Sequence, residues 1–195
     1  SYEERLGRIA STLDKRSVDG NYFLYVGNRK RHKNLGRVIE ALSKIDGKNI
    51  KFVIAGQKDG AGPDEIETQV KDLNLENRVL FFVNPSDEVL ASLYKNARFL
   101  IQPSLIEGFG LPPLEALSLG TPVLLSDIPI FREIYEDAAV YFDPLSVEDI
   151  AVKLLNWIER EANLYVDPPK VTKILLKFDR EKVLDSYISL LEEAG

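Results

Sequence analysis

Two glutamates enclose an unusual turn in the stretch LIEGFGLPPLE, residues 105–115. Between Glu107 and Glu115 lie two glycines and two consecutive prolines. Glycine permits positive φ angles and a close approach of the backbone to a ligand, and proline is suited to the first turn of a helix. A carboxylate accepts hydrogen bonds strongly, which suits vicinal hydroxyl groups. The spacing therefore predicts a site for a hydroxyl-rich ligand at the start of a helix.

The backbone of this turn supplies a second kind of contact. Pro112 and Pro113 have no N–H group, so the amides of Phe109, Gly110 and Leu111 are the donors available at the helix N-terminus. Such amides bind anions or hydroxyl oxygens. For Glu115 a purely structural alternative exists, because a carboxylate near a helix start complements the helix dipole by about 0.3–1 kcal/mol.

A basic loop, GNRKRHKN at residues 27–34, is the other candidate site. It gathers Arg29, Lys30, Arg31 and Lys33 in a chain whose net charge is −6. The loop stands between a predicted strand and a predicted helix, where backbone N–H groups already favour an anion. A solvated basic turn is the alternative. Gly27 is the only glycine of this loop, so neither the G-x-G-x-x-G nor the P-loop motif is present in it.

The elements that must position these residues alternate along the chain. Apolar and β-branched runs predict strands, and apolar residues at helical spacing predict helices. The predicted strands are 22–26, 51–56, 79–83, 98–103, 122–126 and 139–142. The predicted helices are 34–45, 65–75, 87–97, 111–120, 146–160, 170–178 and 180–194, and residues 1–20 are expected to form a short helix and a linker.

Several of these strands are continuously apolar, which is typical of strands covered on both faces in a parallel sheet. Strand and helix in alternation predict a doubly wound, Rossmann-like α/β fold. Ligands of such sheets bind beyond the carboxyl ends of the strands, where the strand order reverses. The loops after Val26, Gly56, Val83 and Pro103 are therefore expected to form the site.

Composition excludes several other classes. The chain of 195 residues is expected to form one domain after the linker, and its 45% hydrophobic content is ordinary for a globular protein. The net charge disfavours nucleic acid as a partner, and no apolar run is long enough for a transmembrane segment. With no cysteine and one histidine, we expect no metal site and a cytoplasmic location. The absence of methionine leaves open an excised or an engineered fragment.

The segment 98–143 closely resembles the donor-binding half of retaining GT-B glycosyltransferases of the family 4-like, group 1 type. Their E-x7-E motif matches Glu107 to Glu115, and YVGNRKRHKNL resembles their first strand and diphosphate-binding loop. FDREKVLDSYISLLEE resembles the terminal helix of that half. The resemblance implies that residues 21–195, including helices at 170–194, form the C-terminal, nucleotide-sugar-binding domain of a GT-B fold.

The resemblance also implies roles for individual residues. Lys33, Arg29 and Glu107 would be catalytic: Lys33 and Arg29 on the diphosphate, and Glu107 on the donor sugar. Arg29 substitutes for a family arginine whose place is held by Asn28. The remaining donor-binding residues would be Gly27 in the diphosphate loop, Asn84 near the nucleobase, Phe109, Gly110 and Leu111 through their amides, and Glu115 on the ribose. Glu136 stands where the family often has glycine.

The implied activity is transfer of a hexosyl group, with a mannosyl group favoured, from a nucleotide-diphosphate sugar. GDP-mannose is the favoured donor and a UDP-sugar the alternative, with no further cofactor. The acceptor would be held by an N-terminal domain outside this chain. That domain would also be the part through which the protein could lie at a membrane surface. A non-catalytic or engineered binding scaffold of the same fold is the competing hypothesis. A hydrolase built on the two carboxylates fits the basic loop less well.

Overall fold

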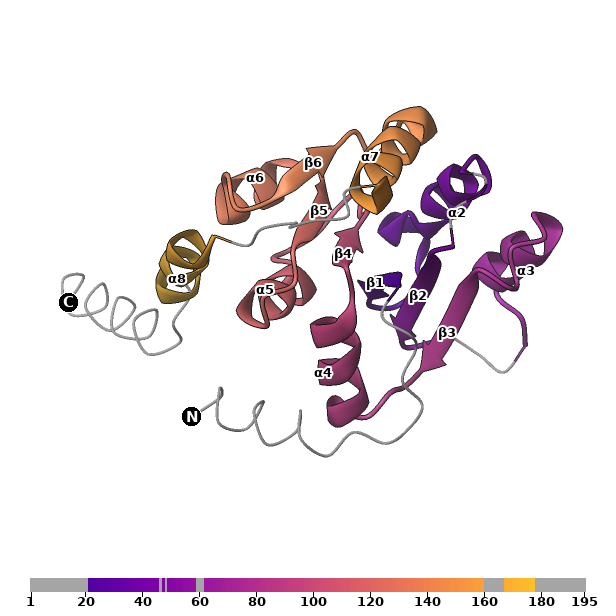
Figure 1. The fold of residues 1–195 in the computed structure, drawn as a ribbon, viewed down its shortest axis with the longest axis horizontal. Helices are drawn as coiled ribbons and strands as arrows, with labels where there is room; N and C mark the ends of the chain where they lie inside the picture. The colour runs from indigo at the N-terminus through magenta and orange to yellow at the C-terminus, as the bar shows by residue number, and fades with distance from the viewer. Residues whose placement is uncertain (1–20, 46, 48, 59–61, 160–166, 178–195) are drawn as a thin grey trace, which may run out of the picture.

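The computed structural model describes residues 21–45, 47, 49–58, 62–159 and 167–177. These form six strands, one short 3₁₀ helix and seven α-helices (Figure 1). The strands are β1 (Tyr22–Val26), β2 (Lys51–Gly56), β3 (Val79–Val83), β4 (Phe99–Gln102), β5 (Val123–Ser126) and β6 (Val140–Phe142). The helices are η1 (Arg31–Lys33), α2 (Leu35–Ser43), α3 (Glu65–Asp72), α4 (Asp87–Asn96), α5 (Leu111–Ser118), α6 (Pro129–Tyr135), α7 (Val147–Glu159) and α8 (Pro168–Lys177).

Every predicted strand is present, and the predicted helices from 34–45 to 170–178 are present with ends shifted by a few residues. Helix α6 and the 3₁₀ turn η1 were not predicted. Both are short, and α6 begins at a proline, so neither shows a sustained helical repeat of apolar residues. The predicted helix 180–194 and the predicted linker 1–20 lie outside the described residues.

The six strands form one parallel sheet with the order β3-β2-β1-β4-β5-β6. Chain order runs outward from β1 to β3, and then the chain returns to pair β4 with the other side of β1, in the register Phe23 with Phe99. The strand order therefore reverses between β1 and β4. This confirms the predicted doubly wound sheet and places the loops after β1 and β4 next to each other at the reversal.

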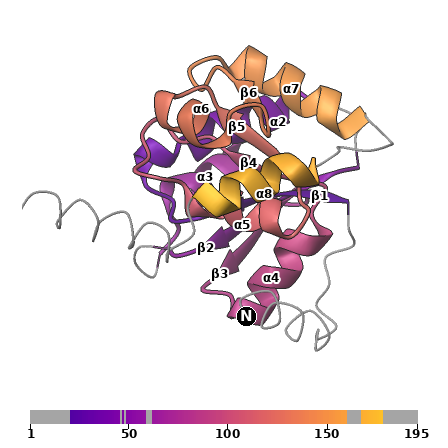
Figure 2. The same ribbon diagram turned by 90° about the vertical axis from the view of Figure 1, so that its left-hand side faces the viewer.

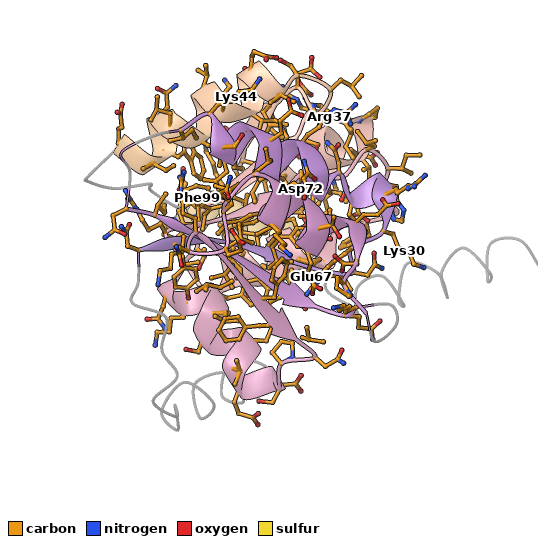
Figure 3. All side chains as sticks on the ribbon, turned by 90° about the vertical axis from the view of Figure 1, so that its right-hand side faces the viewer. Lys30, Arg37, Lys44, Glu67, Asp72 and Phe99 are labelled. Atoms are coloured by element: carbon orange, nitrogen blue, oxygen red, sulfur yellow. The ribbon has the colours of Figure 1, made fainter. Side chains whose placement is uncertain are left out.

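Helices cover both faces of the sheet, as Figures 1 and 2 show. One layer consists of α2, α3 and α7, whose apolar side chains pack on a core that includes the stacked rings of Phe23, Phe52 and Phe99. The other consists of α4, α5, α6 and α8. Figure 3 shows Phe99 in the interior, whereas Lys30 projects outward from the loop after β1. Burial on both faces explains the continuously apolar strands.

The carboxyl ends of the first three strands are joined by close backbone contacts. The N–H of Gly27 donates to the carbonyl of Ala55 at 2.9 Å, and the N–H of Asn84 donates to the carbonyl of Gly56 at 3.0 Å. Gly56 has φ 137°, and a Cβ atom at this position would lie 2.3 Å from the carbonyl oxygen of Gly27. Only glycine fits there, because the opposing group is backbone and cannot rotate away.

Glu136 ends α6 with a backbone conformation that side chains rarely adopt, φ 45° and ψ −119°. Glycine adopts such a conformation without strain, which agrees with the glycine that the resemblance leads us to expect at this position. The carboxylate contacts Lys173 of α8 at 2.8 Å, but that ion pair is exposed and contributes little.

We therefore expect Glu136→Gly to stabilise the protein, because relief of backbone strain outweighs the lost ion pair and the greater chain entropy of glycine. Thermal unfolding should show Tm raised by about 2–4 °C. Glu133→Gly is the matched control: Glu133 lies inside α6 with ordinary helical backbone, so the same substitution there should lower Tm. A lower Tm for both variants would contradict the strain at Glu136.

Candidate functional site

The loop after β1 and the loop after β4 are joined at the strand-order reversal. The backbone N–H of Leu105 donates to the carbonyl of His32 at 2.8 Å. Close to this contact the side chains of Lys33 and Glu107 form an ion pair, with Nζ and Oε1 2.6 Å apart. The two loops that sequence analysis selected therefore meet through two of their predicted site residues.

Glu107 receives three hydrogen bonds on a single oxygen. Besides Lys33, Ser104 Oγ donates to Oε1 at 2.7 Å and Gln102 Nε2 donates to it at 3.1 Å. Ser104 and Gln102 are fully buried, and Gln102 Nε2 also contacts Ser104 Oγ at 3.2 Å. The carboxylate is thus held in one orientation by buried neutral donors and one cation. Its second oxygen, Oε2, has no hydrogen-bond partner among the described residues, which leaves an acceptor for a ligand.

The ion pair is largely withdrawn from solvent, with side-chain exposures of 14% for Lys33 and 11% for Glu107. Burial alone would raise the pKa of Glu107. The hydrogen bonds from Lys33, Ser104 and Gln102, together with the Lys33 charge, outweigh burial and hold the pKa below its ordinary value. The Glu107 charge in turn contributes, after burial, to the raised pKa of Tyr25, whose hydroxyl donates to the carbonyl of Asn28. Because its own pKa lies below the ordinary carboxyl value, Glu107 is ionised at neutral pH.

Gln102 and Ser104 were not among the residues predicted for the site. The available signal was a polar pair at the end of an apolar strand, FLIQPS, because a polar residue that ends a fully buried strand needs a partner. Gln102 retains a buried Oε1 atom that has no hydrogen-bond partner within the described part of the chain.

Helix α5 begins at Leu111, four residues after Glu107. Gly110 is its N-cap residue with φ 85° and is packed against Phe131, which a Cβ atom would approach to 2.6 Å. The buried hydroxyl of Tyr135 donates to the carbonyl of Gly110, and burial raises the pKa of Tyr135. The carbonyl group of Gly110 is thus held in place by a hydrogen bond from within the protein. The amides of Gly110 and Leu111 stand at the helix start, where N–H groups have no acceptor within the helix.

Leu111 and Phe109 differ in exposure. Leu111 is 59% exposed, whereas Phe109 is half-buried and packs on the core layer of α4, α5 and α6. The assignment of all three amides, at Phe109, Gly110 and Leu111, to a ligand stays a prediction.

Glu115 is the fifth residue of α5 and lies past its first turn, so dipole complementation is a weaker account of it than the sequence suggested. Its Oε2 accepts a hydrogen bond of 2.6 Å from the hydroxyl of Tyr94 in α4. The other oxygen, Oε1, has no hydrogen-bond partner within the ranges that the structure describes. Each glutamate of the E-x7-E motif therefore has one anchored oxygen and one that remains available.

Arg29 lies elsewhere than the sequence led us to expect. Its Nη1 contacts Asp64 and Glu67 of the α3 N-terminus, each at 2.9 Å, and its guanidinium lies 4.3 Å from the ring centroid of Phe81. The side chain is only 4% exposed. Two carboxylates already neutralise this charge, so Lys33 is the cation of the loop that lies at Glu107. A catalytic role for Arg29 stays a prediction that this geometry does not support.

Gly27 and Asn84 lie at the same edge of the sheet, at the ends of β1 and β3. Gly27 has φ 150°, and a Cβ atom there would lie 2.7 Å from the Tyr25 hydroxyl. Asn84 is exposed and has a left-handed backbone with φ 49°. Both residues lie at the carboxyl ends of strands, where the site was predicted, and their contacts with a ligand stay predictions.

Within the described ranges no cluster of three or more His, Asp or Glu side chains could hold a metal ion. No helix in the same ranges combines the length and apolar character needed to cross a bilayer.

Curated relatives share sequence with this chain. It is 38% identical over 124 residues to the O-antigen chain mannosyltransferase RfbU of Salmonella typhimurium, a match covering 64% of this chain and 35% of RfbU. It is 36% identical over 139 residues to the serotype-specific mannosyltransferase WbdA of Escherichia coli, covering 70% of this chain and 17% of WbdA. The chain therefore spans about a third or less of these relatives.

Solved structures share the fold. Anabaena HepE, in complex with UDP and glucose, superposes with a TM-score of 0.77 at 19% identity over 98% of this chain and 51% of that one. A glycosyltransferase from Rickettsia africae gives a TM-score of 0.79 at 19% identity over 97% and 52%. The six-stranded domain thus corresponds to half of each molecule, which confirms the predicted C-terminal half of a GT-B fold.

The family model described as "Glycosyl transferases group 1" matches residues 14–171, which include both loops, the Lys33–Glu107 pair and the whole sheet. This range covers most of the chain and agrees with the sequence similarity to mannosyltransferases and with the fold. The chain belongs to the group 1 glycosyltransferase family.

Proposed function

We propose that this domain binds the nucleotide-diphosphate sugar of a retaining hexosyltransferase. The observation that carries the proposal is the contact between Lys33 and Glu107 beside the start of α5. A cation, an oriented carboxylate and helix N-terminal amides are the groups that a sugar diphosphate needs, because it offers anionic oxygens beside neutral hydroxyls.

The proposed division of labour follows from charge. Before a donor binds, Lys33 and Glu107 neutralise each other. A diphosphate gives Lys33 an anionic partner, and a sugar hydroxyl donates to the free Oε2 of Glu107 while Ser104 and Gln102 continue to hold Oε1. As the bond from sugar to diphosphate breaks, negative charge grows on the leaving phosphate. Lys33 then stabilises that charge in the transition state.

The base and sugar of the donor are proposed from similarity. RfbU and WbdA are named as mannosyltransferases, which favours a mannosyl group and GDP-mannose. HepE binds UDP and glucose, so a UDP-sugar is the alternative. Because the relatives extend well beyond the matched range, we propose that the acceptor is held by a further domain of the whole protein. Ile106 and Leu111, which are 72% and 59% exposed and flank Glu107 in the sequence, are proposed to face this further domain.

Calorimetric titration of the 195-residue chain with GDP, UDP and ADP tests this function. We expect heat with one of the three, with GDP favoured, because the diphosphate reaches Lys33 and the base sets the preference among nucleotides. Lys33→Ala should weaken that binding by roughly tenfold, which corresponds to about 1.4 kcal/mol for one lost charge-assisted hydrogen bond.

Lys30→Ala is the matched control, since it removes one positive charge from the same loop at an exposed position without an ion partner within the described residues. Absence of heat with all three nucleotides would overturn the proposed function in favour of a non-catalytic scaffold. Equal weakening by both variants would show that only the net charge of the loop matters.

A further inference from the structure

Asn34 has an unusual position for a polar residue. It follows Lys33, is only 5% exposed, and adopts the left-handed backbone conformation with φ 59° and ψ 26°. Its side chain does not cap the helix that it precedes. A buried amide in a left-handed conformation indicates that its side chain is required elsewhere, because asparagine otherwise favours exposed turns.

The side chain of Asn34 connects three loops. Its Nδ2 donates to the carbonyl of Pro103 at 3.1 Å, after β4, and to the carbonyl of Pro144 at 2.8 Å, after β6. Its Oδ1 accepts from Arg37 Nη1 of α2 at 2.7 Å; Arg37 is labelled in Figure 3. The backbone N–H donates to the carbonyl of Arg31 at 3.0 Å. All of its donors and its acceptor are therefore used by the protein.

The two proline carbonyls explain why an amide is needed. Both lie beyond the last paired residue of a strand, so the sheet provides no N–H group for them, and a buried carbonyl without a donor is costly. An asparagine amide presents two N–H donors on one nitrogen, and it can satisfy both carbonyls at once.

We propose that Asn34 is a positioning residue that holds Lys33 against Glu107. On the cation side of the Lys33–Glu107 contact, Lys33 immediately precedes Asn34 in the chain. On the carboxylate side, Asn34 holds Pro103, which immediately precedes Ser104, and Ser104 donates to Glu107. One side chain therefore sets the relative position of the two loops from which the cation and the anchored carboxylate project. This inference rests on the proposed function for its effect on ligand binding, but its effect on the ion pair does not depend on a ligand.

Asn34→Gly tests the side chain apart from the backbone conformation. Glycine adopts the left-handed conformation without strain and lacks the amide group. We expect about tenfold weaker nucleotide diphosphate binding, measured by calorimetry with the preferred nucleotide among GDP, UDP and ADP. In ¹³C NMR titration of the carboxylates, the pKa of Glu107 should rise toward its ordinary value as Lys33 moves away. A residue that served folding alone would leave both quantities unchanged in the folded protein.

Asn74→Gly is the matched control. Asn74 has nearly the same positive φ angle, 56°, but it is exposed and its side chain has no hydrogen bond within the described residues. This variant should keep the wild-type nucleotide affinity and Glu107 pKa. Asn34→Asp is a second test variant that retains the contact with Arg37 and the left-handed preference while losing both N–H donors, and it should behave like Asn34→Gly.

The outcomes separate the two hypotheses. A wild-type Glu107 pKa and wild-type nucleotide affinity in the folded Asn34 variants would overturn the positioning role. If the unsubstituted chain binds none of the nucleotides, the proposed function fails, whereas the pKa of Glu107 still decides the role of Asn34. Should Asn34→Gly unfold, the same two measurements on Asn34→Asp decide it.

Discussion

Replacing Lys33 with alanine is expected to lower the turnover rate of a transferase that contains this domain by roughly 10²–10³. Lys33 is the cation that contacts Glu107, with Nζ 2.6 Å from Oε1, and Arg29 is already neutralised by Asp64 and Glu67. Removing Lys33 therefore removes the charge proposed to stabilise the leaving diphosphate. It also leaves the shielded Glu107 carboxylate without its cation. The measurement is kcat and KM with the preferred donor.

Two comparisons make this test specific. Lys30→Ala, in the same loop but exposed, should retain kcat within a few-fold. A Lys33→Ala enzyme with unchanged kcat and only a higher KM would contradict the assigned role, because Lys33 would then contribute equally to the ground state and the transition state. Arg29→Lys provides a further comparison: a structural ion pair at α3 predicts reduced stability with a small effect on kcat.

The second large effect is expected at the sheet edge. Gly56→Ala should lower the free energy of unfolding by about 3–5 kcal/mol, combining backbone strain at φ 137° with overpacking against the Gly27 carbonyl at 2.3 Å. Because both groups are backbone at the ends of paired strands, neither can move without breaking the hydrogen bonds from Gly27 to Ala55 and from Asn84 to Gly56. Urea unfolding of the two proteins gives this difference.

Gly62→Ala is the control for that substitution. Gly62 has no heavy atom within 4 Å of the added Cβ and no positive φ, so its replacement should change the free energy of unfolding by less than about 1 kcal/mol. Similar losses for Gly56→Ala and Gly62→Ala would contradict this explanation, because Gly62 has neither the positive φ nor the contact with the Gly27 carbonyl.

Much of the fold could be predicted from local patterns. Strands such as β1 and β2 are continuously apolar because both of their faces are covered, and that burial is visible as composition. Helices with long apolar repeats, such as α2 and α7, were equally clear. Helix α6 was missed because its seven residues complete less than two apolar repeats. Its position is stabilised by packing of Phe131 and Tyr135, which no local pattern encodes.

The candidate site was predictable where its residues stand close together in the chain. Glu107, Gly110 and Glu115 lie in one short segment, so their types and spacing carried the prediction. The partners that orient them could not be found in this way: Glu107 depends on Lys33, 74 residues away, and Glu115 on Tyr94 in another helix. Arg29 is an example in which the local sequence was not sufficient. Its basic loop predicted contact with an anionic ligand, whereas the ion pair with Asp64 directs the side chain to α3.

By itself the sequence determined the alternation of strands and helices, the parallel sheet and the segment that contains the two glutamates, because each depends on periodicity or spacing over a few residues. The sequence predicted four loops at one edge of the sheet, but only the tertiary structure decided which of these loops touch and through which side chains. The strand order places β1 beside β4, and this brings Lys33 to Glu107 and Asn34 to Pro103. The physical reason is that a hydrogen bond or ion pair depends on distances of about 3 Å between atoms, and strand order sets those distances for residues far apart in the chain.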